Sequence, residues 1–512
     1  MTNLRSPLLS TAFLSLLATG AALSDDNVVY IGQTGNTNTV IIDQLGSGNL
    51  VGSDNNAIFV SQDGSNNVLE AQQTGYDNEA GAAKTAGALG LLGIYQNGDR
   101  NIASISQQNS NPAGQNSIGA ISQNSDTNRA IIANSINITQ TDASANGTLG
   151  TGNGAGNHVI GEILQINTGG DANILNISQF DGTTGSGDGN RVQTVIQEGS
   201  GNLATISQEE QGNEVAELRQ YGADNEATIT QEDGVNNFVN VVTQDGDNNR
   251  SRLTLSGSRN LVFSVLQSNA LVGTIGNIAT ITLSGDDNGG DGMGGLGQFT
   301  RSITQLLQVA QGEVNQFGDE NILNFVTSGT SSMNLYGFVQ DGDGNALSGT
   351  VDGAENEAAA LQIGDGNRLD FLQEGDHNTI AVSYRGDDNM LFAKQLGDEN
   401  TIEVTFDGGV SPITRSNQNN DPAIGGFTSD VAAYADTLMP GDALQFGNLN
   451  YAKITIHSGN QNKIAFAQTG DENTINGVTT GHQNQVLITQ TGYLNNAEYS
   501  QSGNNNSLVI IQ

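Results

Sequence analysis

Apolar and amide residues recur along this chain with a period of two inside a longer period of eleven. The unit reads Gln-x-Gly-x-x-Asn-x-h-x-h-x-Gln, where h is usually apolar. Asn225, Ile229 and Gln231, for example, fall on alternate positions, so they face one side of an extended chain. Alternation of this length predicts a strand of about seven residues, followed by a turn that contains Gly.

The same spacing returns throughout the chain, which identifies a set of inward amides. Its clearest members are Gln33, Asn38, Gln44, Gln62, Asn67, Gln73, Gln362, Asn367, Gln373, Asn378, Gln395, Asn400, Gln490, Asn495, Gln501, Asn506 and Gln512.

One such strand cannot bury its inward face alone. Two consecutive strands folded face to face make a 22-residue coil, and stacked coils continue two parallel sheets. Stacked amides then bond to one another as ladders, which offsets the cost of burying them. We therefore predict an all-β, repetitive β-solenoid of two-strand coils, roughly 18 to 22 of them, with looped-out insertions. An antiparallel meander of hairpins and a disordered Asn/Gln-rich tract remain open as alternatives.

Composition narrows the function classes. The chain has 54 acidic and 16 basic residues, a formal net charge of −38, which argues against nucleic acid as a partner. It has no Cys, so a disulfide scaffold and a thiolate metal site are excluded. The first 24 residues have a basic residue, an apolar run and small residues in the order of a signal peptide. No later segment is apolar enough to span a membrane, so export from a bacterial cell is expected.

The pattern divides the chain into repeats and breaks, and we expect the breaks to be surface insertions. After the signal peptide (1–24), the predicted segments are repeats 25–78, insertion 79–94, repeats 95–140, insertion 141–158, partly degenerate repeats 159–285, Gly/Asp-rich insertion 286–300, repeats 301–406, insertion 407–444 and repeats 445–512. Two strands, 190–197 and 213–220, carry one extra residue that a bulge would have to absorb.

The combination of inward Gln, turn Gly, Asn and an alternating apolar pair resembles the curlin repeat family. The resemblance covers most of the chain after residue 24 and implies a subunit of curli-like extracellular amyloid fibres, used in cell adhesion and the biofilm matrix. It also implies self-association, curli-type export and nucleation proteins as partners, and a pilus-like location on the surface of a Gram-negative bacterium. This chain is much longer than a typical five-repeat member. Its first repeat begins directly after the predicted cleavage site, so no separate N-terminal export segment is visible.

Acidic turns suggest a possible cofactor. Asp365, Asp376, Asp387 and Asp398 follow one another at intervals of eleven residues and should stack along the two edges of the solenoid. Stacked carboxylates repel, so weak Ca²⁺ binding is one hypothesis, and solvated acidic turns are the other.

Signals for catalysis are weak. The four histidines are far apart in the sequence, and nucleophile and phosphate-loop motifs are missing. We therefore expect a non-enzymatic protein. The alternatives to a fibre subunit are a monomeric calcium-stabilised surface adhesin rod and a solenoid polysaccharide hydrolase or lyase.

The last strand, 508–512, is the edge at which we predict that copies join. Its Leu508 and Ile510 should face inside, and its Val509 and Ile511 outside.

Overall fold

The structure is a computed structural model of the chain. It describes residues 27–46, 48–52, 60–75, 78–81, 89, 93–109, 115–126, 131–142, 158–181, 189–269, 275–290, 299, 307, 309–407, 426–457 and 459–512. The predicted signal peptide therefore lies outside the described residues. Two compact units divide the chain, unit 1 up to Asn236 and unit 2 from Asn237.

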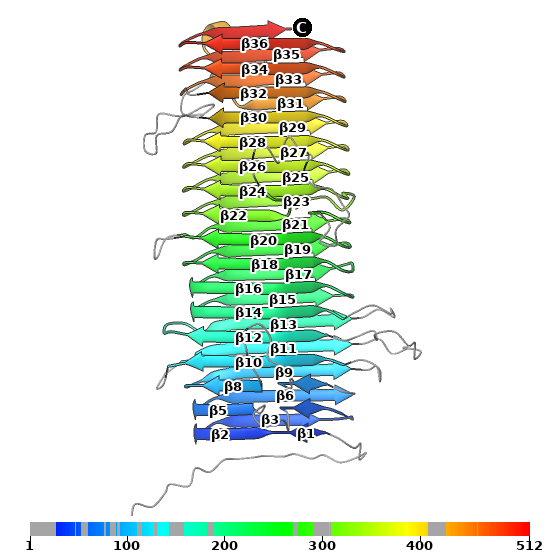
Figure 1. Cartoon of the computed structure of the whole chain (residues 1–512), viewed down its shortest axis with the longest axis vertical. Coiled ribbons are helices and arrows are strands. Elements are labelled where there is room, and N and C mark those ends of the chain that lie inside the picture. The colour runs from blue at the N-terminus through cyan, green and yellow to red at the C-terminus, as the bar shows by residue number, and fades with distance from the viewer. Residues whose placement is uncertain are drawn as a thin grey trace, which may run out of the picture. The chain divides into compact units, whose positions relative to one another are not determined.

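Unit 1 is a stack of parallel strands in two facing sheets (Figure 1). Its sheet A contains β1 (Val28–Val29), β2 (Ile31–Asn36), β4 (Leu50–Val51), β5 (Val60–Ser65), β7 (Glu79–Ala80), β8 (Gly93–Asn97), β10 (Ser117–Ser125), β12 (Val159–Asn167), β14 (Arg191–Ser200) and β16 (Glu214–Ala223). Its sheet B contains β3 (Thr39–Gln44), β6 (Val68–Gly75), β9 (Asn101–Asn109), β11 (Asn134–Asp142), β13 (Asn173–Asp181), β15 (Leu203–Glu209) and β17 (Glu226–Glu232).

Unit 2 has the same two-sheet arrangement. Its sheet A contains β18 (Phe238–Asp245), β20 (Leu261–Ser268), β22 (Glu313–Phe317), β24 (Leu335–Asp341), β26 (Glu357–Ile363), β28 (Thr379–Arg385), β30 (Thr401–Asp407), β32 (Tyr451–His457), β34 (Thr474–Thr480) and β36 (Asn496–Ser502). Its sheet B contains β19 (Arg250–Ser256), β21 (Ile278–Ser284), β23 (Ile322–Thr327), β25 (Ala346–Asp352), β27 (Arg368–Glu374), β29 (Met390–Leu396), β31 (Asp442–Phe446), β33 (Lys463–Thr469), β35 (Gln485–Thr491) and β37 (Ser507–Ile511). One helix, α2 (Ser429–Ala435), lies in the segment between β30 and β31.

Successive strands of one sheet pair in parallel and in register. Gln373 pairs with Gln395, for instance, and Asn134 with Asn173. Each coil therefore contributes one strand to each sheet, which confirms the two-sheet β-solenoid and excludes the antiparallel meander.

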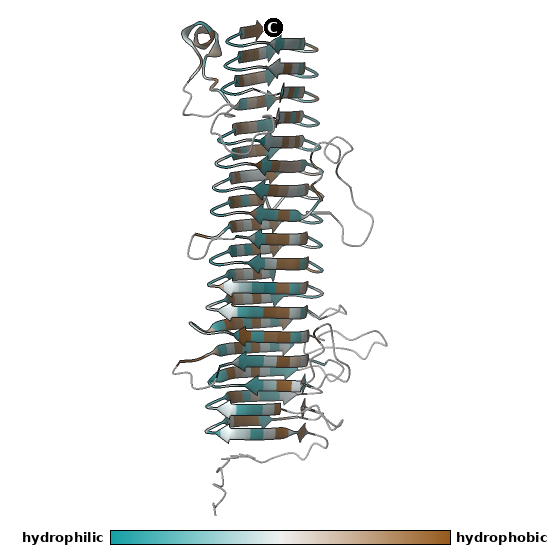
Figure 2. Cartoon of the chain, turned by 60° about the vertical axis from the view of Figure 1, so that its left-hand side comes forward, coloured by the Kyte–Doolittle hydropathy of each residue, from teal (hydrophilic) through white to brown (hydrophobic). Residues whose placement is uncertain are grey.

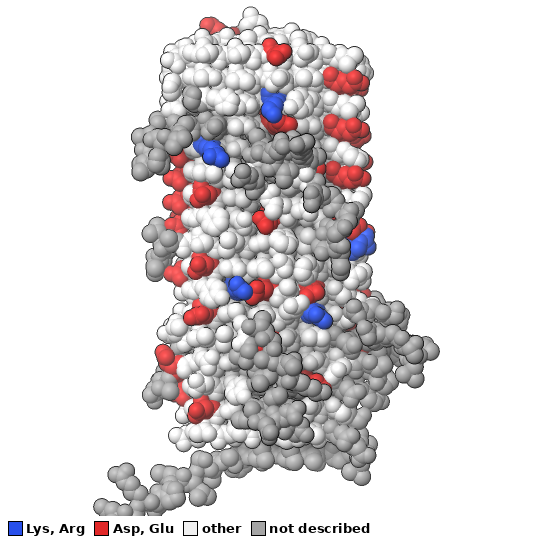
Figure 3. All heavy atoms as spheres, viewed as in Figure 1, with Lys and Arg blue, Asp and Glu red and all other residues white. Residues whose placement is uncertain are grey.

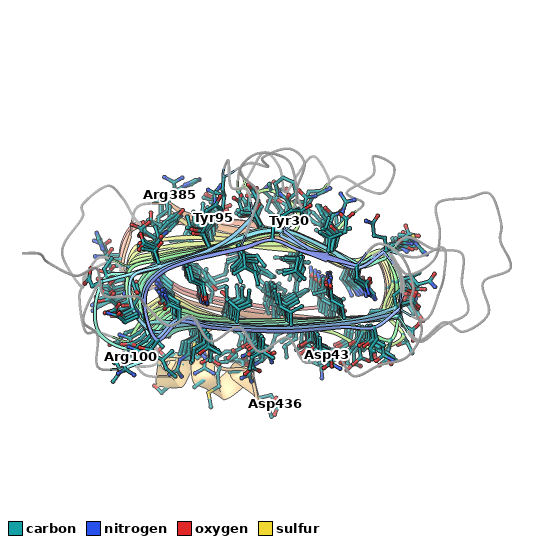
Figure 4. All side chains as sticks on the ribbon, turned by 90° about the horizontal axis from the view of Figure 1, so that it is seen from below. Tyr30, Asp43, Tyr95, Arg100, Arg385 and Asp436 are labelled. Carbon is teal, nitrogen blue, oxygen red and sulfur yellow. The ribbon has the colours of Figure 1, made fainter. Side chains whose placement is uncertain are left out.

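The interior is a narrow layer of aliphatic and amide side chains. Along β17, Ala227, Ile229 and Gln231 are fully buried, while Thr228 and Thr230 between them are half-exposed. Seen end-on, the inward side chains of successive coils fall on one another in columns (Figure 4), and the strands alternate apolar and polar residues along their length (Figure 2). The alternation in the sequence thus separates core from surface, as predicted.

The turns require glycine for two reasons. Gly375 has a φ of +116°, a conformation that side chains of L-residues rarely adopt. A Cβ at Gly375 would also collide with the carbonyl oxygen of Gly397 in the next coil. Stacked turns therefore approach too closely for any side chain at this position.

The extra residue in the longer strands is absorbed without changing the buried face. In β14, Val192, Val195 and Gln197 are all buried, although Val192 and Val195 are three positions apart. The neighbouring strand β16 places its own extra residue at the same point, where Gln193 lies beside Ala216 and the paired register is interrupted. A bulge that stacks on an identical bulge keeps the ladder in register.

The strands of sheet A in unit 1 are also interrupted at this same position, as the pairing of β10 with β7 and then with β8 shows. The segments 52–59 and 81–92 separate β4 from β5 and β7 from β8. The expected insertion 79–94 therefore overlaps strand residues at both of its ends. In unit 2, Phe299, Leu307 and Val309 from the segment after Asn288 pack on the outer side of sheet A against Leu335, Ala359 and Ala381.

Candidate functional site

The candidate site is the set of amide columns inside the solenoid, together with the two chain ends where these columns stop. In sheet A of unit 1 the glutamines form one continuous ladder, in which each Nε2 donates to Oε1 of the next. The members are Gln33, Gln62, Gln96, Gln123, Gln165, Gln197 and Gln220, with donor–acceptor distances of 2.6–3.0 Å. Sheet B of unit 1 has a second ladder through Gln44, Gln73, Gln107, Gln140, Gln179, Gln208 and Gln231, at 2.8–3.1 Å.

In most ladder glutamines, such as Gln197, Nε2 also bonds a backbone carbonyl group at the corner between two strands. Nε2 of Gln197, for example, also donates to the carbonyl oxygens of Ile174 (3.0 Å) and Asn202 (3.2 Å). A buried primary amide thus finds partners both along the stack and across the corner, which offsets its desolvation.

In unit 2 only one ladder is present at a time. Sheet A carries it from Gln244 through Gln267, Gln316 and Gln340 to Gln362. Sheet B then carries it from Gln373 through Gln395, Gln445, Gln468 and Gln490 to Gln512.

Opposite each ladder of unit 2, the equivalent position holds other residues. In sheet B these are Leu255, Leu283, Thr327 and Val351, and in sheet A they include Tyr384, Ile456 and Thr479. Oε1 of Gln373, the first amide after the change of sheet, is buried and has no hydrogen-bond partner. Its neighbour below is Val351, which has no donor to offer.

The asparagines form two further columns. In both of them the bonds between asparagines point to the earlier coil, which is the reverse of the direction of the glutamine bonds. The backbone N–H and Nδ2 of Asn389 both donate to Oδ1 of Asn367 in the coil before it, at 3.0 and 2.8 Å. Nδ2 also bonds turn carbonyls, as in Asn378, which donates to the carbonyl oxygen of Gly397. Asparagine therefore both stacks and fastens the turn, which is why it precedes nearly every strand.

One histidine occupies an asparagine position, and the sequence interpretation missed it. His158 is fully buried, accepts the backbone N–H of Asn190 at Nδ1 (3.3 Å) and donates from Nε2 to the carbonyl oxygen of Thr141 (3.3 Å). Burial lowers the pKa of His158 to about 4, against the smaller raising effects of Thr141 and Asp142. The signal was available, because His158 precedes Gln165 by the same seven positions that separate Asn190 from Gln197.

The four aspartates proposed for Ca²⁺ do lie in two columns along the turns. Oδ1 of Asp387 accepts the backbone N–H of Asp365 (3.0 Å), and Oδ1 of Asp398 accepts that of Asp376 (2.9 Å). Asn448 occupies the next place in the second column and accepts the N–H of Asp398 in the same way. Figure 3 shows acidic side chains recurring one above another along the turns. Each carboxylate thus already satisfies one turn N–H, and no group of three or more His, Asp or Glu side chains in the described ranges is arranged to hold a metal ion.

The two chain ends present complementary groups. At the end of unit 2, Gln512 uses one of its two amide hydrogens, on the carbonyl oxygen of Asn496, and Oδ1 of Asn506 accepts no bond within the described chain. At the start of unit 1, Gln44 donates to Gln73 and to the carbonyl oxygen of Asn49, while its Oε1 accepts no bond from any described residue. The C-terminal end therefore offers glutamine donors and asparagine acceptors, and the N-terminal end offers glutamine acceptors.

Strand spacing also matches between the ends. Asn and Gln are six positions apart in the first strands (Asn27 to Gln33, Asn38 to Gln44) and in the last (Asn495 to Gln501, Asn506 to Gln512). Most sheet A strands between them in unit 1 are longer, as in the seven positions from Asn213 to Gln220. Both ends therefore carry unbulged strands of one length.

Comparison with known proteins adds no family. No protein-family model matches the chain, and no curated protein is similar to it. Within the part of the chain that the structure describes, α2 is too short to cross a bilayer, and no helix there has the length and apolarity to do so.

Proposed function

We propose that this protein is a structural subunit that adds copies of itself end to end and builds an amyloid-like fibre outside the cell. The observation that carries the proposal is the complementarity of the two ends. Docking Gln512 of one copy onto Gln44 of the next continues the sheet B ladder, donor to acceptor. In sheet A, Gln501 would then lie over Gln33 and begin the ladder of the next copy. End strands with open backbone groups are the usual template for such addition.

The polarity of the ladders favours head-to-tail addition. Within each ladder described above, the glutamine bonds point from the earlier coil to the later one, as from Gln468 to Gln490. Joining two N-terminal ends would set acceptor against acceptor, whereas a head-to-tail joint continues the direction and can repeat without limit.

The biological setting rests on the repeat and on the first 24 residues. The resemblance to curlin repeats supports a role in adhesion and the biofilm matrix, without catalysis. The signal-like start supports export, with curli-type secretion and nucleation proteins as partners at a Gram-negative cell surface. A net charge of −38 suits a screened exterior and would limit side-to-side clumping of the acidic turns.

Electron microscopy and seeded thioflavin kinetics on the chain from Asp25 to Gln512 test the proposal. We expect unbranched fibres that grow from added seeds and give fibre diffraction at about 4.8 Å along the axis. Deleting Leu508–Gln512 removes the last strand and should slow growth severalfold. Deleting 53–59, which lie between β4 and β5 in the sequence, is the control of similar size. Isolated particles of monomer mass at every concentration, with no response to seeds, would instead support a monomeric rod.

A further inference from the structure

The helix α2 is the one described helix of the solenoid, and it sits beside the C-terminal end of the chain. It covers a column of outward apolar residues on sheet B of unit 2, namely Ala465 on β33, Leu487 on β35 and Val509 on β37. The sequence interpretation left Val509 on an open outer face. The structure places it against α2 instead.

The helix is firmly seated. Val431, Ala435 and Leu438 are 1%, 5% and 8% exposed, and they pack on the column just described. The backbone N–H of Thr428, at the start of α2, donates to Oε1 of Gln485 (2.8 Å), and Nζ of Lys463 donates to the carbonyl oxygen of Gly426 (2.5 Å).

The position of α2 places it at the rim of the solenoid. It contacts β35 and β37, and β37 is the last strand of its sheet. Figure 2 shows the helix level with the strands next to the C-terminus. The cluster that contains α2 includes Val509 on the last strand, so it lies within one strand spacing, about 4.8 Å, of the place that the next strand would take.

The strand that would take that place carries an apolar residue at the matching position. Val509 and Ile41 each lie three residues after the strand's Asn, so pairing Asn506 with Asn38 puts Ile41 next in the column after Val509. Ile41 is 45% exposed in the chain by itself.

Within unit 1 this column is otherwise polar. The residues that follow Ile41 in register are Glu70, Ser104, Asn137, Asn176, Thr205 and Thr228. Ile41 therefore has no apolar neighbour in this column of unit 1.

We infer that α2 is an intermolecular clamp, which spans the joint between two copies and covers Ile41 of the incoming copy. The inference rests on the proposed end-to-end assembly, and it names the contact that sets the strength of the joint. Because α2 belongs only to the C-terminal end and Ile41 only to the N-terminal end, the clamp also reinforces head-to-tail polarity.

The test compares Ile41→Ser with Ile174→Ser, a matched change of an outward residue of the same sheet that is 38% exposed on β13. Ile41→Ser should raise the critical concentration for fibre growth by about tenfold, the effect expected for leaving one large aliphatic side chain uncovered. The urea midpoint of the monomer should stay unchanged, and Ile174→Ser should grow like the unmodified chain.

A second variant, Val431→Ser, weakens the seat of α2 and completes a double-mutant cycle. If both residues act at one joint, Ile41→Ser added to Val431→Ser should change growth far less than it does alone. Equal growth of Ile41→Ser and Ile174→Ser, or simple additivity with Val431→Ser, would overturn the clamp and leave end-to-end assembly intact. Absence of fibres from the unmodified chain would remove the proposed function itself.

Discussion

The two units place different residues at the same corner position of the coil, the last inward position of each strand. Unit 1 has glutamine in both sheets of every coil, so two ladders run side by side. Most coils of unit 2 have glutamine in one sheet and mainly Leu, Val, Ile, Thr or Tyr in the other. The ladder changes sheet between Gln362 and Gln373.

The difference separates what the coil requires from what it tolerates. The asparagine columns persist in both units, because each Asn fastens a turn as well as stacking. The corner glutamine bonds only its neighbours and two carbonyl groups, so an aliphatic side chain of suitable volume can replace a whole run of the ladder. A single replacement inside a ladder is another matter, because it leaves two buried groups without partners.

The largest expected effect comes from breaking a ladder of unit 1. Gln179 accepts from Gln140 and donates to Gln208, both at 2.8 Å and all buried. Gln179→Leu should lower the free energy of unfolding of unit 1 by about 4 kcal/mol, since both neighbours lose a partner. Urea unfolding with segment-resolved hydrogen exchange measures it, and the outward neighbour change Ser178→Ala is the control. A cost no larger than the control's would show that the ladder contributes nothing.

The second largest effect is expected at low pH, which should destabilise unit 1 through His158. The folded pKa of about 4 lies below the ordinary 6.5, so the unfolded chain binds the proton more readily. Stability from this group is complete above about pH 6.5 and is lost as the pH falls toward 4, by about 3 kcal/mol in unit 1. His158→Asn should remove this part of the acid sensitivity, while His377→Asn, an exposed change in unit 2, should not. Parallel pH profiles for His158→Asn and the unmodified chain would contradict the assignment.

We expect a gain in stability from a substitution at the point where the ladder of unit 2 changes sheet. Val351→Gln places a donor below the unpartnered Oε1 of Gln373 and extends the ladder by one member. We expect about 1 kcal/mol of added stability. Val351→Leu, which adds volume without an amide, is the matched control in thermal unfolding. If the glutamine variant is the less stable of the two, the missing partner is not what limits this corner.

The smallest effect concerns the acidic turns of unit 2. Asn448 already fills one place in the column of Asp376 and Asp398, so Asp398→Asn should keep the acceptor and change stability by about 0.5 kcal/mol or less. Asp398→Ala should cost more, because the N–H of Asp376 loses its partner. Melting the three proteins with Ca²⁺ and with a chelator also tests the calcium hypothesis: a large Ca²⁺-dependent shift that Asp398→Asn abolishes would favour a metal on these turns.

Much of the fold could be predicted because the same pattern of inward and outward residues recurs in many repeats. Asn225, Ile229 and Gln231 face inward as their spacing indicates, and the four turn aspartates stack along two edges. The role of His158 was missed because its residue type differs from the rest of its column. That the breaks in sheet A of unit 1 fall at the bulge position was not predicted, because a one-residue bulge leaves only a faint trace in the spacing. The segment boundaries, the signal peptide and the cellular location stay predictions.

The sequence by itself determined which side chains face inward, where the chain turns, and that coils must stack, because period-two alternation and turn glycines act locally. Only the tertiary structure decided which partner each buried amide finds, where the glutamine ladder changes sheet, and that α2 covers Val509. Those outcomes depend on contacts between residues 22 or more positions apart, such as Gln490 with Gln512 and Thr428 with Gln485. Such contacts exist only after the coils have stacked, and no local pattern specifies them.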